Sequence, residues 1–252
     1  MDVKPILMPD GRIASNGYDE YYRELNSLKT HVLESEQLLR HLNQDQEQHI
    51  LNIQERNKTS NLLTASCNNT ERAKHMKSLD TIERLLREEM DNLTTNRTVL
   101  MERCKEALHR AGIIQSRILD GELERWKRGQ QLMGNGVPYN GYSLDEIQDF
   151  CENIAELVWQ TRVQVKRQHM LCQTYPPAPQ HDPYVLNTLY QLLEIGSQLL
   201  IRMVKSTFVI EKQPPQVMKT MTRFTSTVRL LVGGKLNVHM TPPQVTVFII
   251  SE

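Results

Sequence analysis

The basic side chains after position 201 are the residues of this sequence whose type and spacing most clearly indicate a function, the binding of a polyanion. That segment carries seven basic and two acidic residues, a net charge of +5. The formal charge of the whole chain is zero, so the first 201 residues carry −5. Lys and Arg side chains neutralise phosphates and release counterions whatever the base sequence. We therefore expect the basic segment to contact a polyanion, the alternative being ordinary variation of surface charge.

The other reactive side chains form no catalytic or metal-binding pattern. The cysteines Cys67, Cys104, Cys151 and Cys172 contain no CxxC pair, so we expect reduced thiols in a reducing compartment. The sequence has no GxSxG, P-loop or glycine-rich dinucleotide turn. Its histidines and acidic residues are scattered, and His49 fits a helix seam better than a metal site. These observations predict a protein that is not an enzyme and that holds no metal and no cofactor.

A second candidate contact surface centres on an aromatic residue followed by two cations. Trp126, Lys127 and Arg128 are consecutive. They predict either a surface for partner proteins and import factors, or a tryptophan that anchors its helix against the β-rich end of the chain. The sequence favours the second interpretation for Trp126.

Hydrophobic periodicity predicts the elements that position these residues. An apolar seven-residue frame runs from Leu25 to Ile53, and the same frame places Ser35, Gln46 and His49 in the seam. Such polar interruptions indicate a long helix that leaves the main core toward its far end. Residues 1–17 contain two prolines and two glycines and little periodicity, and we expect a flexible leader there.

Three further helices follow the first. A break over 62–70 precedes a pattern that continues past GELERWKRGQQLM for about 60 residues, a rod of roughly 90 Å. Ser143 and Glu146 have capping-box spacing, which predicts the start of the third helix, and Asp182-Pro183 predicts the start of the fourth. The expected fold is mainly α, an elongated antiparallel four-helix bundle over residues 18–206.

The hydrophobic period changes from 3.6 to 2 near residue 207. We predict a strand over 208–210, an alternating strand over 224–232, a hairpin at Gly233-Gly234 and a return strand over 236–240. A final β-prone run covers 245–250. Three or four strands do not close a sandwich, and an open apolar edge favours aggregation. We therefore expect residues 207–252 to be the incomplete N-terminal part of an Ig-like β domain.

Three sequence blocks resemble the STAT transcription factor family. ELERWKRGQQ, residues 122–131, is similar to the end of the second helix of the STAT coiled-coil domain. QHDP, residues 180–183, is similar to the start of its fourth helix. Residues 208–252 resemble the junction with the DNA-binding domain, and KQPPQV and RLLVGGKLNVHM most resemble the fifth mammalian branch and the invertebrate members.

This resemblance implies a function. STAT proteins are signal transducers and sequence-specific transcription factors of the cytokine-receptor and JAK pathway, found in cytoplasm and nucleus. The implied partners are DNA, other transcription regulators and import factors, and a second copy in the intact phosphorylated protein, with no membrane. The sequence holds the coiled coil and the start of the DNA-binding domain, without an SH2-like segment. The alternative is a truncated coiled-coil protein that sequesters partners without binding DNA.

The resemblance also implies particular DNA-binding residues. The VMKT segment matches the family pattern V(L/I)KT, in which the lysine meets the DNA backbone and later residues line the groove. Lys219, Thr220 and Arg223 are therefore the expected DNA contacts. Gly129 stands where the family commonly has a second arginine, which weakens the basic motif at residues 126–128. The sequence leaves open the activating receptor or kinase, the target genes, the coiled-coil partner and whether the chain is a natural short form.

Overall fold

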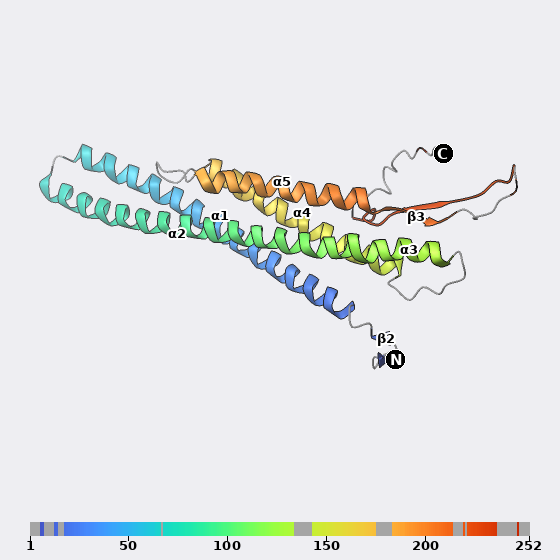
Figure 1. Cartoon of the computed structure of the whole chain (residues 1–252). Helices are drawn as coiled ribbons and strands as arrows, with labels where there is room; N and C mark the ends of the chain where they lie inside the picture. The colour runs from blue at the N-terminus through green and yellow to red at the C-terminus, as the bar shows by residue number, and fades with distance from the viewer. Residues whose placement is uncertain are drawn as a thin grey trace. The chain divides into compact units, whose positions relative to one another are not determined.

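The protein is described by a computed structural model that is predominantly helical (Figure 1). Two short strands, β1 (Ile6–Leu7) and β2 (Ile13–Ala14), pair antiparallel within the predicted leader. The rest of that leader lies outside the described residues, and the predicted domain boundaries stay a prediction. The structure describes residues 6–7, 13–14, 18–66, 68–133, 143–174, 183–213, 219, 221–235 and 246.

Four long helical segments occupy the predicted positions. The first two are separated only by residues 66–68, inside the predicted break. The second segment is helical over 65 residues from α2 to α3, but it contains a π-helical stretch, η1, that the periodicity did not predict. Their bounds are α1 Tyr18–Ala65, α2 Asn69–Ser116, η1 Arg117–Leu123, α3 Glu124–Met133, α4 Leu144–Thr174 and α5 Pro183–Ser206.

The start of α4 has the capping box that its sequence predicts. The Glu146 backbone N–H donates to Ser143 Oγ at 3.2 Å, and the Ser143 N–H donates to Glu146 Oε2 at 2.7 Å. These reciprocal bonds satisfy donors that the first helical turn leaves without partners. The helix therefore begins where the sequence predicts.

The chain folds as two compact units. The first consists of residues 1–29, 108–160 and 196–252, and the second of residues 30–107 and 161–195. In the first unit Arg117 of η1 contacts Glu24 and Arg110 of α2 contacts Ser27, so α1 runs antiparallel to the second helical segment. Gln115 of α2 donates to Leu199 O, and Asp120 of η1 accepts from Arg202, so residue numbers rise in the same direction and α5 runs parallel to the second helical segment.

The second unit has the same helix directions. His31 contacts the Arg103 carbonyl and His49 contacts Glu89, so α1 and α2 are antiparallel there as well. Gln164 donates to Val32 O while Leu171 O accepts from Gln46, so α1 and α4 run parallel. First and third helices that run parallel, each antiparallel to its sequence neighbour, define the predicted up-and-down bundle.

The polar positions of the first seam are buried in the second unit. Ser35, Gln46 and His49 are exposed by 1, 3 and 7%. Arg103 donates to Ser35 Oγ, Arg97 donates to Gln46 Oε1 at 2.9 Å, and His49 Nδ1 lies 2.9 Å from Glu89 Oε2. Hydrogen-bond partners on α2 let these polar side chains occupy the interior. Within the described part of α1, hydrophobic side chains are buried only as far as Leu42, so the helix leaves the apolar core toward its far end, as the sequence predicts.

Aromatic rings pack in the first unit near the π-helical stretch. The rings of Tyr21 and Tyr22 lie 5.2 and 5.3 Å from that of Phe150. The Arg117 guanidinium lies over the Tyr21 ring, 4.8 Å from its centroid. Burial, followed by the nearby charge of Glu122, raises the pKa of Tyr21. Tyr21 is therefore a core residue on the buried face of α1.

The β segment of the first unit is a two-stranded antiparallel ladder. Strand β3 (Phe208–Lys212) pairs with β4 (Thr227–Leu230), and a register irregularity falls between Ile210 and Lys212. Strand β4 is thus shorter than the predicted alternation over 224–232. The predicted return strand lies outside the described residues, as does most of the run over 245–250.

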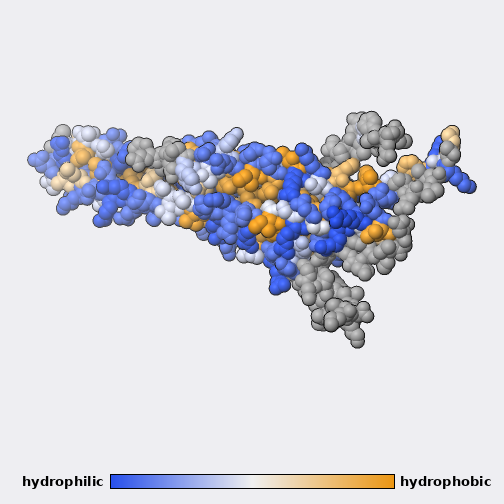
Figure 2. Space-filling model, in the orientation of Figure 1, coloured by the Kyte–Doolittle hydropathy of each residue, from blue (hydrophilic) through white to orange (hydrophobic). Residues whose placement is uncertain are grey.

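The visible surface is mostly hydrophilic, with hydrophobic residues showing among the polar ones (Figure 2). Within the described ranges, none of the helices combines the length and hydropathy that a membrane crossing requires.

Candidate nucleic-acid interface

Hydrogen bonds at both ends and the buried side chain of Val209 hold the β ladder. Leu231 N–H donates to Thr207 O at 3.0 Å, and Ser226 Oγ donates to Lys212 O at 2.9 Å. Val209 is 4% exposed and lies opposite Arg229 in the ladder. The segment between the strands therefore starts and ends at positions that the ladder defines.

Two of the three predicted DNA contacts are described, and both are exposed. Lys219 and Arg223 are exposed, whereas Thr220 lies outside the described residues. Thr222 N–H donates to Lys219 O at 3.2 Å, which closes a four-residue turn. Met221, the third residue of this turn, is fully exposed and has φ of 68°, a conformation uncommon for a residue other than glycine. The turn thus presents Lys219 at its first position.

Three cations of the basic segment are engaged with carboxylates of the helices. Arg202 donates to Asp120 Oδ2 and Arg229 to Asp145 Oδ1, each at 2.6 Å. Lys235 Nζ donates to Glu156 Oε2 at 2.6 Å. Three of the seven cations that the sequence predicts to bind phosphate therefore pair with carboxylates of the first unit instead.

Two of these pairs, those of Arg229 and Lys235, join the β segment to α4. The hydrogen bond to Asp145 is the main cause that raises the pKa of Arg229, with Glu211 adding to it. The hydrogen bond to Glu156 likewise raises the pKa of Lys235. Arg229 and Lys235 thus tether the β segment to α4.

The Gly233-Gly234 pair lies in a turn that packs tightly. Gly233 N–H donates to Leu230 O at 2.9 Å, and a Cβ on Gly233 would lie 3.0 Å from that oxygen. A Cβ on Gly234 would lie 2.9 Å from Glu152 Oε1. Glycine at position 233 therefore lets the backbone approach its own strand, whereas at position 234 the Glu152 side chain could move away from a Cβ.

The other four cations of the basic segment have no ion pair among the described residues. They are Lys205, Lys212, Lys219 and Arg223. Lys212 ends β3, and Lys219 and Arg223 follow in the segment between the strands. The sequence does not distinguish these cations from Arg229 and Lys235. Whether a cation has an ion pair depends on which carboxylates of α4 lie near it in the fold. Exposed cations of this kind can neutralise phosphate groups, a contact that by itself carries no base code.

In the predicted partner surface at residues 126–128, the tryptophan is buried and the last cation is exposed. Trp126 is 5% exposed. Lys127 donates to Glu124 Oε1 at 2.7 Å, and Arg128 is exposed without an ion pair among the described residues. The ring is buried, and its role as an anchor against the β-rich end of the chain stays a prediction. A partner role stays a prediction, in which Arg128 is the accessible member.

The described side chains include no group of three or more His, Cys, Asp or Glu residues placed to hold a metal ion. Three cysteines, Cys104, Cys151 and Cys172, are free and buried. Burial raises the pKa of Cys104 and of Cys151 to about 12 and also raises that of Cys172. These thiols are therefore core residues with little thiolate character.

The fold and the unpaired cations define a class of protein: an up-and-down four-helix bundle that continues into a cationic β segment. The family model for the STAT transcription factor coiled-coil domain matches residues 22–200. The model for the STAT protein DNA-binding domain matches residues 212–252. This chain belongs to the STAT family, as its sequence blocks predict.

Known proteins agree with this assignment. A "Signal transducer and transcription activator" of Drosophila melanogaster is 38% identical over 131 residues. That alignment covers 52% of this chain and 16% of the Drosophila protein, so this chain corresponds to a small part of its relative. The solved structure described as STAT2 in complex with IRF9 shares the fold with a TM-score of 0.60 at 12% identity, covering 74% of this chain and 98% of that one.

Proposed function

We propose that this chain supplies the partner-binding bundle and part of the DNA-contacting domain of a signal-transducing transcription factor. The observation that carries the proposal is the pair Lys219 and Arg223, exposed and without ion pairs among the described residues. They lie in the range that matches the DNA-binding domain of the family. Lys219 contacts backbone phosphate, Thr220 follows it along the groove, and Arg223 lies nearer the bases.

The bundle is proposed to bind other transcription regulators. Its structural neighbour STAT2 was solved in complex with a second protein, IRF9, which supports a partner-binding role for this fold. We further propose that import factors use the region of Lys127 and Arg128. The intact phosphorylated protein then dimerises and acts in the cytokine-receptor and JAK pathway between cytoplasm and nucleus.

The DNA proposal is tested by fluorescence anisotropy with labelled duplexes of several sequences, over a salt series from about 50 to 200 mM, the range in which phosphate contacts dominate. The 252-residue chain should bind weakly and with a clear salt dependence. Lys219→Ala should weaken binding to all duplexes alike and lower the salt slope by about one. Arg223→Ala should change the preference between duplexes.

A matched control is Lys74→Ala, an exposed lysine of α2 with no ion pair among the described residues, which should leave binding unchanged. An unaltered salt slope in Lys219→Ala would contradict the phosphate contact. If the unsubstituted chain bound no duplex even at low salt, the alternative of a partner-sequestering bundle would replace this proposal.

A further inference from the structure

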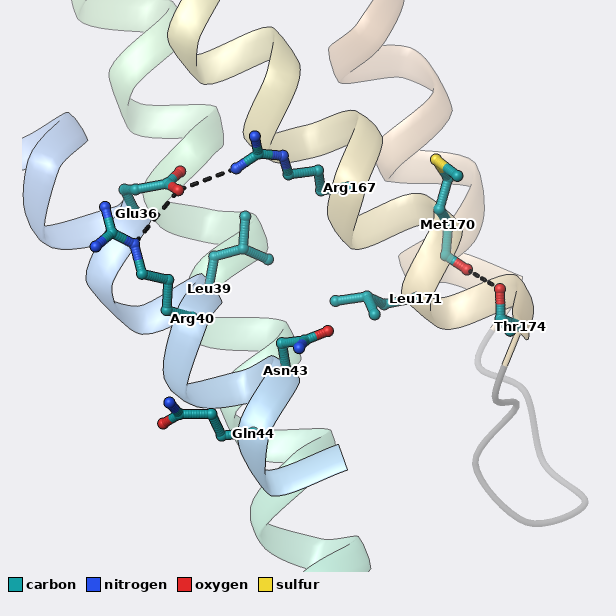
Figure 3. Close-up of a pocket in the computed structure, with 9 residues that line it drawn as sticks. All are labelled: Glu36, Leu39, Arg40, Asn43, Gln44, Arg167, Met170, Leu171 and Thr174. Atoms are coloured by element: carbon teal, nitrogen blue, oxygen red, sulfur yellow. Dashed lines mark hydrogen bonds and ion pairs between the residues drawn. The ribbon is translucent and has the colours of Figure 1, made fainter. Parts of the chain in front are cut away.

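A groove of about 510 Å³ lies between α1 and α4 in the second unit (Figure 3). Its size is that of an ordinary ligand-binding pocket. None of the assignments above uses it, since the candidate DNA contacts belong to the β segment of the first unit. Two neighbouring helices form its walls, through Glu36, Leu39, Arg40, Asn43 and Gln44 of α1 and Arg167, Met170, Leu171 and Thr174 of α4.

The middle of the groove is apolar. Leu39 and Leu171 point into the space between the helices, and Leu39 is 4% exposed (Figure 3). Met170 is 55% exposed at the α4 side. The Thr174 hydroxyl is turned to the Met170 carbonyl at 2.9 Å, so it offers its donor to its own helix. The apolar strip is therefore available to a hydrophobic side chain, and methionine adapts to different shapes.

One end of the groove is positively charged. Arg167 Nη1 and Arg40 Nε approach the same oxygen, Glu36 Oε1, at 3.0 and 3.6 Å (Figure 3). The two arginine side chains are 58 and 70% exposed. Among the residues that line the groove, these two arginines are the cations and Glu36 is the single acidic residue. One carboxylate thus serves two guanidinium groups, each of which has five N–H donors.

We propose that this groove binds an acidic amphipathic helix of another protein. Grooves between paired helices accept the apolar face of a third helix through side chains spaced by three or four residues. Two such side chains cover Leu171 and Met170, above the buried Leu39. A carboxylate one or two turns further along bonds Arg40 and Arg167, a charge-assisted contact that gives each guanidinium its own acceptor.

The charge of the groove argues against a second copy as the occupant. A two-fold dimer brings the same surface of each copy together. Where the two-fold axis passes through the charged end of the groove, Arg40 and Arg167 of one copy would lie beside the cations of the other. A partner of opposite charge removes this repulsion and is steered toward the site. The proposal rests on the partner-binding role proposed for the bundle and names the chemistry of the partner.

A random helical peptide library displayed on phage, panned on the 252-residue chain, tests the proposal. The enriched peptides should have apolar residues at helical spacing followed by Asp or Glu. Affinities of synthetic copies are then measured by fluorescence anisotropy. Arg40→Glu/Arg167→Glu should weaken binding about tenfold or more, in the range expected for close charge pairs. Met170→Ser should also weaken it, while the control Lys74→Glu/Lys77→Glu on α2 should not.

Charge reversal makes the test specific. A peptide whose acidic residue is replaced by Lys should bind the Arg40→Glu/Arg167→Glu chain better than it binds the unsubstituted chain. These side chains are exposed, so circular dichroism should show unchanged helix content in every variant.

If the enriched peptides lack acidic residues, or bind the variants and the unsubstituted chain equally, the groove proposal is overturned. The bundle would then bind its partners through another surface. An empty selection would overturn both the groove and the partner-binding role. Self-association in sedimentation velocity that Arg40→Glu/Arg167→Glu alters would assign the groove to a second copy and overturn the proposal.

Discussion

Gln168 offers a test of how the second unit tolerates polar residues in its core. Its side chain is 0% exposed, and Nε2 donates to the Arg97 carbonyl at 2.7 Å. Its other polar atom, Oε1, has no hydrogen-bond partner among the described residues. The amide nitrogen of Gln168 therefore has a hydrogen-bond partner, whereas its buried amide oxygen has none among the described residues.

The expected effect of Gln168→Met follows from these two atoms. Losing the bond to Arg97 O removes about 1 kcal/mol of net stability, and this carbonyl keeps its place in the α2 hydrogen-bond ladder. Removing the unpaired oxygen relieves a desolvation cost of about 1–3 kcal/mol. Met has a similar length and fills the same space with apolar atoms. We expect Gln168→Met to stabilise the chain by about 1 kcal/mol.

Gln168→Ala should instead destabilise the chain. It loses the same bond and leaves a cavity, and large-to-small changes in cores cost about 2–5 kcal/mol. Thermal denaturation followed by circular dichroism distinguishes the two, because 1 kcal/mol moves Tm by roughly 2–4 °C in a chain of this size class. The exposed control Gln37→Met should change stability by less than about 0.5 kcal/mol. If Met destabilised as strongly as Ala, the polar bond would outweigh the unpaired oxygen and the reasoning would be refuted.

Two further predictions concern α4 and the buried thiols. Ser143→Ala should destabilise the chain by about 1 kcal/mol in urea denaturation through loss of the Glu146 cap, whereas Ser143→Asp should retain most of the stability. Iodoacetamide at pH 8 should label Cys104 and Cys151 slowly in the folded chain and readily in urea, as peptide mass spectrometry reports, because burial raises their pKa values from 9.0 to about 12. Since the folded state holds these protons more tightly, stability should fall as the pH rises from 9 toward 12, and rapid labelling of the folded chain would contradict this.

Local signals in the sequence predicted the helices. The capping residues Ser143 and Glu146, the break near residue 67 and the apolar seam from Leu25 act within a few turns of the chain, so each is legible in one dimension. The family followed from blocks that resemble known members, and the two family models confirm it. Thr220 and the return strand over 236–240 lie outside the described residues and stay predictions.

The sequence by itself determined the helices, the change of period near residue 207 and the excess of positive charge after residue 201. Only the tertiary structure decided which cations are engaged: Arg229 and Lys235 meet carboxylates about 80 residues away on α4, while Lys219 and Arg223 do not. It also decided that Gln46 is buried, since its partners lie on other helices. The physical reason is the same in both cases. A charge or an amide has its energy set by the groups that packing brings to it, and those contacts have no periodicity in the sequence.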